Sequence, residues 1–348
     1  MSESPGISPV MVSPPRRQEV PGPDLPHFSE TFSWRIMVTF IWVAILALTA
    51  GGLWWYGRGA SENFLGDQSL DLIWRRAVPL LLLVGPTTVI MLGGGLDLSV
   101  GAVLGLSSVV TASALAEGKS PEDAFLLAML FSGGIGLLHA LLVGAASLHP
   151  VVLTLVTAPL IQSAAMVYSN GQQNVLVAQD HGSLDFLPDT VMLVVASAVI
   201  SLVLIQLAQI GGGSRGVPAR RQRWHRRTLF ISLPYILSSL AAGFAGSCTV
   251  GRLHIGSPGA GGQLTLTVIF AALIGGNCTG RRFGTVIGAV AAVVILAAGE
   301  HLMIMEAVSP SYTALFIAAS AGAALLLSEL VHWIANIFYR NSRPIPVA

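Results

Sequence analysis

The sequence predicts an all-α membrane protein, a polytopic bundle of about ten transmembrane helices. Only 18 basic and 17 acidic residues occur among 348, so 10% of the chain is charged, against roughly 25% in a soluble domain. Hydrophobic residues make up 53% and glycine adds 38 residues. The mean hydropathy is +0.73. A chain of this composition cannot provide the polar surface of a water-soluble fold, so lipid is the expected solvent for most of it.

Charge and cysteine content exclude other classes. The formal net charge is +1 and no basic domain is present, which argues against nucleic acid as a partner. Cys248 and Cys278 fit no zinc or disulfide framework. The expected topology places these two residues on opposite sides of the membrane, so a disulfide between them is not expected.

The chain begins with a segment that predicts no fold. Residues 1–30 contain seven prolines and no apolar period, so they cannot offset their ordering entropy. We therefore expect a disordered cytoplasmic tail at 1–30, a transmembrane domain at 31–338 and a short cytoplasmic tail at 339–348.

The first apolar stretch is Ile36–Trp55, bounded by Arg35 and Arg58. At 1.5 Å per residue it crosses about 30 Å of hydrocarbon, and it is too long for the core of a signal peptide. Nine more spans are expected at Ala77–Leu92, Leu98–Leu115, Ala124–Leu148, Val151–Tyr168, Val191–Gln209, Leu229–Ser247, Leu264–Gly276, Gly284–Met303 and Tyr312–Ile334.

The arginines predict the orientation. With ten spans, four arginine clusters fall on one side, which the positive-inside rule makes the cytoplasm, and both termini lie there. The clusters are Arg16, Arg17 and Arg35; Arg215, Arg220, Arg221, Arg223, Arg226 and Arg227; Arg281 and Arg282; and Arg340 and Arg343. The exceptions are Arg75 and Arg76, where we expect a partly buried helix before the second span.

The segment Met91–Gly101 interrupts an apolar run with three consecutive glycines and Asp97. A helix is expected to break at Gly93–Asp97, and backbone groups freed at membrane depth must find partners in protein or in a watery cavity. Asp97 fits an N-cap whose charge is offset by the positive end of the next helix. Two interpretations stay open: a structural cap alone, or a cap that also lines a solute route. The route residues expected around this break are Thr87, Thr88, Gly94, Asp97, Ser99 and Ser107, with Ser108 also placed to contribute.

Glycines recur at intervals of four in two places, at Gly101 and Gly105 and again from Gly276 to Gly288. Small residues at this spacing favour close packing of helices.

Three motifs resemble those of permease subunits in ribose-type ABC sugar importers. Gly93–Gly101 (Gly-Gly-Gly-Leu-Asp-Leu-Ser-Val-Gly) is similar to that family's Gly-Gly-Ile-Asp-Leu-Ser-Val-Gly. The segment Val151–Leu155 after His149-Pro150 resembles its Pro-x-Phe-Ile-x-Thr-Leu. Ala271–Gly276 with Gly280–Gly288 resembles its Ala-Ala-Val-Val-Ile-Gly-Gly and the Gly-x-x-x-Gly-Thr-x-x-Gly that follows.

The resemblance implies a permease subunit with a type II-like ABC importer fold in the bacterial inner membrane. It implies passage of a monosaccharide or similar small polar solute by alternating access, in a homodimer or heterodimer with a second permease. It also implies a cytoplasmic ATPase carrying ATP-Mg and a periplasmic solute-binding protein. The chain itself is expected to be no enzyme and to hold no cofactor, because its nearest Walker A candidate, Ser113–Ser120, has serine in place of the first glycine.

Two departures from the family pattern stand out. The segment expected to contact the ATPase is replaced by an arginine-rich run, whose candidate coupling residues are Arg220, Arg221, Arg223, Trp224, Arg226 and Arg227. This run fits either a topology anchor on anionic membrane lipid or a rewritten ATPase contact. In addition, Thr265 and Thr267 stand where the family has Glu and Asp, which points to a different solute or a weakened transport role. We also place these two threonines on the route.

Two other functions stay open. The altered coupling segment is compatible with a non-transporting or regulatory subunit derived from a permease. An ion-coupled secondary transporter would use Glu300 or Asp97 as its proton site. Among the remaining polar residues, His139 is expected to pack in a hydrogen bond, and Glu300 and His301 point too far apart for direct pairing.

Overall fold

The computed structural model describes residues 32–60, 64, 66–146, 148–177, 222–276 and 286–341. This part of the chain contains nine helices and two short strands. They are α1 (Phe32–Ala60), α2 (Asp67–Leu92), α3 (Val100–Ala116), α4 (Pro121–Gly144), α5 (Pro150–Tyr168), β1 (Val175–Leu176), α7 (Gln222–Leu253), β2 (Ile255–Gly256), α8 (Gly262–Ile274), α9 (Val286–Met305) and α10 (Pro310–Asn341).

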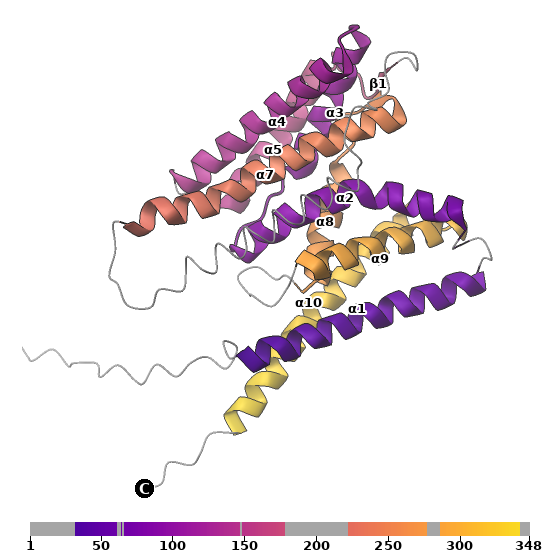
Figure 1. The fold of residues 1–348 in the computed structure, drawn as a ribbon, viewed down its shortest axis with the longest axis vertical. Helices are drawn as coiled ribbons and strands as arrows, with labels where there is room; N and C mark the ends of the chain where they lie inside the picture. Colours follow the sequence, from indigo (N-terminus) through magenta and orange to yellow (C-terminus); the bar gives the residue numbers. More distant parts are fainter. Residues whose placement is uncertain are drawn as a thin grey trace, which may run out of the picture.

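The helices form two groups along the longest axis of the molecule (Figure 1). At one end α3 packs against α4, α5 and α7, and at the other end α9 packs against α1. Helices α2 and α8 join the groups, because α2 contacts α7, α8 and α9 while α8 contacts α3, α9 and α10. The two strands form an antiparallel ribbon that packs on α3, with Val175 opposite Gly256.

The helical bundle expected from hydropathy is confirmed, with a helix at each of the nine predicted spans that lie in described residues. The predicted span Val191–Gln209 lies outside them, so the total of ten stays a prediction. Two details were wrong, and a short ribbon was not expected. Arg75 and Arg76 belong to the continuous helix α2 and not to a separate helix before it. Helix α7 begins at Gln222, seven residues before the predicted start. The ribbon adds two strands to the all-α prediction.

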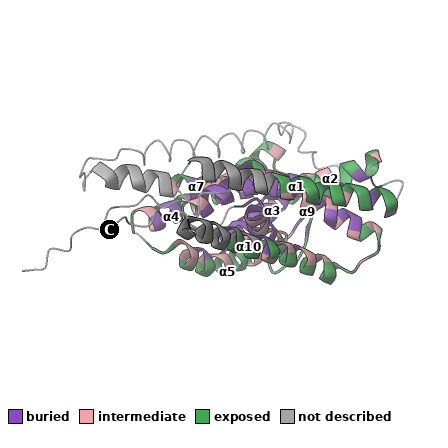
Figure 2. Cartoon of the chain, turned by 90° about the horizontal axis from the view of Figure 1, so that it is seen from below, coloured by how far each residue is buried: buried purple, intermediate pink, exposed green. Residues whose placement is uncertain are grey.

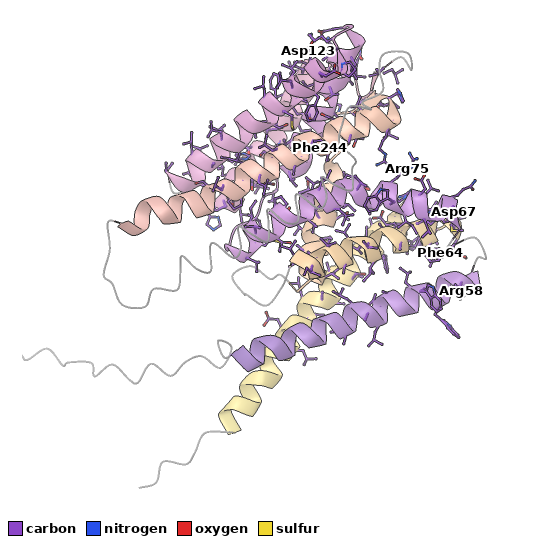
Figure 3. The ribbon with its side chains drawn as sticks, in the orientation of Figure 1. Arg58, Phe64, Asp67, Arg75, Asp123 and Phe244 are labelled. Carbon is purple, nitrogen blue, oxygen red and sulfur yellow. The ribbon has the colours of Figure 1, made fainter. Side chains whose placement is uncertain are left out.

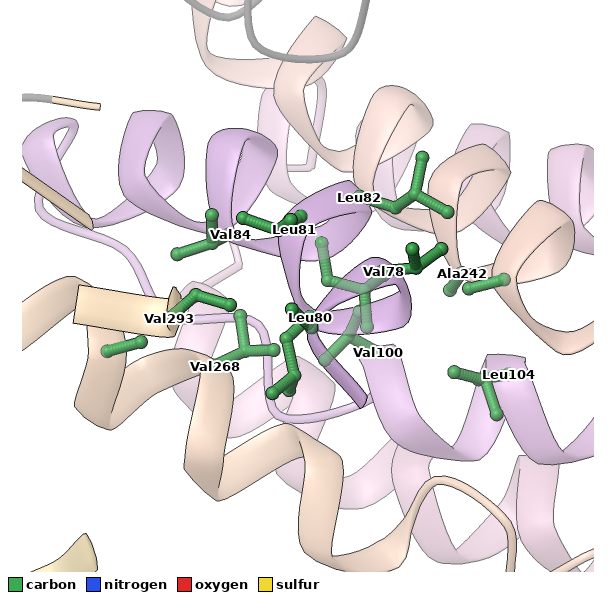
Figure 4. Close-up of a cluster of buried hydrophobic side chains, with 14 of the residues drawn as sticks. Val78, Leu80, Leu81, Leu82, Val84, Val100, Leu104, Ala242, Val268 and Val293 are labelled. Atoms are coloured by element: carbon green, nitrogen blue, oxygen red, sulfur yellow. The ribbon is translucent and has the colours of Figure 1, made fainter. Parts of the chain in front are cut away.

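The core lies where α2 crosses its neighbours. Leu80 and Val84 of α2 lie near Val268 of α8 and Val293 of α9, and Val100 lies at the start of α3 (Figure 4). Branched side chains without polar atoms fill this crossing, which keeps the interior close-packed. Proline occurs twice within α2, at positions 79 and 86, and the packing on three sides holds the helix together despite the lost backbone bonds.

The outer faces of the bundle are strongly apolar. Figure 2 shows α3 buried at the centre, with exposed residues on α4, α5 and α10 around it. On α4 and α5 the exposed side chains include Leu130, Leu141, Leu155 and Leu160. Apolar faces of this extent belong in lipid. Five described helices, namely α2, α4, α5, α9 and residues 232–253 of α7, are long and apolar enough to cross a membrane.

Charged residues gather at the end of the bundle where α2 begins. Arg75 pairs with Asp71 within α2, and Arg252 at the end of α7 donates to the carbonyl of Arg75 at 2.7 Å. Asp67 and Arg75 lie at this end in Figure 3. Arg76 lies 3.7 Å from Glu300 of α9. These contacts join α2, α7 and α9 at a partly exposed surface, where each ion pair contributes little stability.

Candidate functional site

The three consecutive glycines end α2 in a Schellman motif. The amide of Gly95 donates to the carbonyl of Ile90 at 3.0 Å, and the amide of Gly94 donates to Met91 at 2.9 Å. Gly94 has a φ of +86°, which side chains with a Cβ rarely adopt. The expected break is therefore present, and its first half is a helix end that satisfies its own carbonyls.

Gly95 is required for a different reason, the approach of a side chain from α7. A Cβ at this position would lie 2.5 Å from the hydroxyl of Tyr235. Tyr235 is buried and packs with Ile90 and Val143. The third glycine thus lets α7 reach the segment Gly93–Ser99, which we call the break.

Asp97 is sealed inside the protein. It is 1% exposed, and its carboxylate accepts three hydrogen bonds: from the amide of Ser99 at 3.0 Å, from the hydroxyl of Ser99 at 2.6 Å and from the hydroxyl of Ser238 at 2.8 Å. The N-cap residue of α3 is Ser99 and not Asp97 as the sequence suggested. The carboxylate still lies at the positive end of α3, which favours its charge. These contacts give Asp97 a structural role, and its contact with a solute stays a prediction.

A second helix holds the break through Thr154, the threonine of the Val151–Leu155 motif on α5. Its hydroxyl accepts the amide of Leu98 at 3.1 Å and lies 3.2 Å from the carbonyl of Leu96, to which it can donate. It can also donate to the carbonyl of Pro150 in its own helix at 3.0 Å. The amide after Asp97 is therefore satisfied by this side chain, whose one proton is shared between the carbonyls of Leu96 and Pro150.

A third contact comes from α8, which begins inside the bundle beside the first turn of α3. The hydroxyl of Thr265 accepts the amide of Gly101 at 3.0 Å. The backbones of Gly101 and Gly261 touch so closely that a Cβ at Gly101 would lie 2.1 Å from the carbonyl oxygen of Gly261. The two short helices thus bring their amino ends together, and the carboxylate of Asp97 lies at the amino end of α3.

The other predicted route residues fall into two kinds. Ser107 donates to the carbonyl of Gly243 at 2.6 Å and so joins α3 to α7, whereas Ser108 bonds to the backbone of Ser257 in the segment between β2 and α8. Thr267 donates to Gln263 within its own helix. Thr87 and Thr88 differ from all of these, because their hydroxyls are buried and have no hydrogen-bond partner. Gly94 is exposed.

Gly101 and Gly105 pack as their spacing predicted, since Cβ atoms there would strike Gly261 and Pro258 respectively. The repeat from Gly276 to Gly288 does not lie along one helix, because α8 ends at Ile274 and Gly276 has a φ of +85°.

The arginine-rich run is only partly described. Arg220 and Arg221 lie outside the described residues. Positions 223, 224, 226 and 227 lie in the first two turns of α7, so this part is helix where a loop was expected. Whether it contacts an ATPase stays a prediction.

The polar residues His139 and Glu300, which lie away from the break, have polar partners. The Nε2 atom of His139 lies 2.8 Å from the hydroxyl of Thr157, as the packing interpretation expects. Glu300 pairs with Arg76 and not with His301, whose ring stacks on Phe64 at 6.3 Å between centroids. In the described ranges, no group of three or more His, Cys, Asp or Glu side chains could hold a metal ion.

The break and the side chains Thr154, Ser238 and Thr265 form a polar centre inside an apolar bundle. Sequence reasoning missed two of these side chains. Thr154 could have been found from its place in the Val151–Leu155 motif, but nothing in the sequence distinguishes Ser238 from neighbouring serines. These side chains supply hydrogen-bond partners to the backbone and the carboxylate of the break, as polar groups away from water need.

An interrupted helix bundle with apolar outer surfaces defines the class of multi-pass membrane proteins. Residues 69–210 match the family model described as the permease component of the branched-chain amino acid transport system. A probable ABC transporter permease of Sinorhizobium fredii is 30% identical over 243 residues, which are 64% of this chain and 71% of the relative. The chain belongs to this family of ABC transporter permeases.

Relatives with named solutes are similar over comparable lengths. The ribose import permease of Bacillus subtilis is 28% identical, covering 70% of this chain and 79% of the relative. The D-allose permease of Escherichia coli is 29% identical, and the match covers 75% of this chain and 82% of the relative. No solved structure matches the chain significantly.

Proposed function

We propose that this chain is the permease subunit of an ATP-driven importer for a monosaccharide or a similar small polar solute. It acts in the bacterial inner membrane with both termini in the cytoplasm. A separate ATPase binds ATP-Mg, a periplasmic binding protein delivers the solute, and a second permease, identical or related, completes the pathway. The observation that carries this proposal is the similarity to permeases named for ribose, D-allose and galactofuranose.

Groups in and before the break support a polar solute. A sugar crossing lipid loses hydrogen bonds from water to each hydroxyl, and each loss costs several kcal/mol when it is not replaced. Thr87 and Thr88 offer hydroxyls without a partner inside the protein. Helices α3 and α8 also place their amino ends, which carry a partial positive charge, beside each other inside the bundle. ATP binding on partner chains would then favour one of two openings, as any ligand does that binds one state more tightly.

Uptake into membrane vesicles tests this function. Vesicles holding the chain with its ATPase and binding protein are given radiolabelled ribose, allose or galactofuranose. We expect ATP-dependent uptake of at least one of them, and none with an ATPase that cannot hydrolyse ATP. Uptake that needs only a pH gradient would support the ion-coupled alternative. Failure of uptake with every partner would support the non-transporting one.

Glu300 provides a separate test of ion coupling. Its carboxylate pairs with Arg76 at 3.7 Å, and their side chains are 17% and 41% exposed. An ion pair of this kind contributes about 1 kcal/mol or less. We therefore expect Glu300→Gln to leave ATP-driven uptake within about fivefold of the native rate at each pH, the factor that about 1 kcal/mol corresponds to. Glu306→Gln, at an exposed position near the same end of α9, is the control. If Glu300→Gln abolished uptake and Glu306→Gln did not, the result would favour Glu300 as the proton site of an ion-coupled transporter.

A further inference from the structure

Ser238 ties the break to α7. Its hydroxyl is buried and donates to the carboxylate of Asp97 at 2.8 Å, across 141 positions of sequence. Hydrogen bonds to ionised acceptors are about twice as strong as neutral ones. This bond therefore fixes the position of Asp97 relative to α7.

Helix α7 also carries the last part of the arginine-rich run, from Arg223 to Arg227. The helix is continuous from Gln222 to Leu253. Ser238 lies eleven residues after Arg227, a distance of about 17 Å along the axis at 1.5 Å per residue. One helix therefore joins the residues expected at the cytoplasmic face to the side chain that holds the break.

A different helix holds the other side of Asp97. Thr154 of α5 accepts the amide of Leu98 and lies within hydrogen-bond distance of the carbonyl of Leu96. Its contacts are with backbone, whereas Ser238 contacts the carboxylate. The break is thus held between α5 and α7, and its position depends on both.

We propose that Ser238 is a positioning residue that makes the break follow α7. A movement of the cytoplasmic end of α7 then displaces Asp97 and the first turn of α3. The bond links the ATPase side of the subunit to the centre of the solute pathway. The link to the ATPase rests on the proposed function. The positioning of the break by Ser238 does not.

The neighbouring residue provides a matched control. Ser239 is also buried in α7, and its hydroxyl has no hydrogen-bond partner. Ser238→Ala and Ser239→Ala therefore remove the same atom from adjacent positions, and only the first removes a bond to the break. Ser238→Thr keeps the hydroxyl and serves as the conservative rescue.

Hydrogen exchange of the purified full-length chain in lipid nanodiscs measures the tie without transport. We expect amides in a peptide covering Gly93–Gly101 to exchange about tenfold faster in Ser238→Ala, the loss expected for a bond to a charged group. Ser239→Ala and Ser238→Thr should stay close to native. Equal exchange in Ser238→Ala and native protein overturns the proposal, as does equal acceleration in both alanine variants.

Coupling is measured in the reconstituted complex as ATP hydrolysed per radiolabelled ribose or allose taken up. We expect this ratio to rise several-fold in Ser238→Ala and to stay native in Ser239→Ala, because α7 then moves without carrying the break. A merely structural loss would lower the amount of active protein and leave the ratio unchanged, which overturns the coupling role. Absence of sugar uptake by the native complex would count against the proposed function and leave the exchange result to decide the tie.

Discussion

Gly261→Ala is expected to lower the stability of the bundle strongly. A Cβ at Gly261 would lie 2.0 Å from the carbonyl oxygen of Gly101 and 2.5 Å from its Cα. Both atoms are backbone in the first turn of α3, which cannot move without breaking the bond between Gly101 and Thr265. Overpacking costs about 1–3 kcal/mol even where side chains can adjust. We expect a loss at or above the top of that range, measured as the thermal midpoint of the purified protein.

Gly262→Ala is the control for that experiment. A Cβ at Gly262 meets no atom within 4 Å, although the residue is adjacent in sequence and begins α8. It should be neutral or slightly stabilising, because alanine has the higher helix propensity. Gly101→Ala should lower the stability as much as Gly261→Ala does. The double variant should lose less stability than the two single losses added together, since both changes disrupt one contact. A native midpoint for Gly261→Ala would mean that α3 and α8 do not meet here.

Local features of the fold were predictable because they depend on neighbours in sequence. Apolar runs gave the positions of the helices, and Gly93–Gly95 before Asp97 indicated where α2 ends. The crossing of α3 and α8 was not predictable, because the bond between Gly101 and Thr265 spans 164 positions. Glycine in an apolar span has many uses, and only the three-dimensional arrangement identifies the partner backbone.

The partners of Asp97 show the same limit. Serines are common in apolar helices, where many donate to a carbonyl one turn earlier, as Ser132 and Ser320 do. Ser238 has no local signal that separates it from these. The glycines and Asp97 indicated that polar backbone groups would need hydrogen-bond partners, but they did not indicate which helices would supply them.

Helix α7 starts earlier than we expected, and the amino-acid composition before it explains the error. Glycines and a proline between positions 211 and 218 indicated a loop, and that expectation was extended through the arginines. Arginine and glutamine favour helix when no glycine or proline intervenes. The described helix accordingly includes the arginines that follow Gln222.

Asp97→Ala is expected to have the second large effect. The change removes the acceptor of three hydrogen bonds and leaves the hydroxyls of Ser99 and Ser238 without it in a buried site. A buried group left unsatisfied costs about 1–3 kcal/mol, so we expect a loss of about 3 kcal/mol or more in the free energy of unfolding. The thermal midpoint of the purified chain measures it.

The thermal midpoint of Asp97→Asn should lie between those of the native protein and Asp97→Ala. The amide keeps one acceptor oxygen, and its NH₂ group can donate to a serine hydroxyl. Asp123→Ala provides the exposed control near the start of α4, where the carboxylate lies at the surface (Figure 3). The order native, asparagine, alanine follows from hydrogen bonding alone. If Asp97→Asn instead kept native stability but lost uptake entirely, the charge itself would be needed by the transported solute, and Asp97 would belong to the pathway as well as to the scaffold.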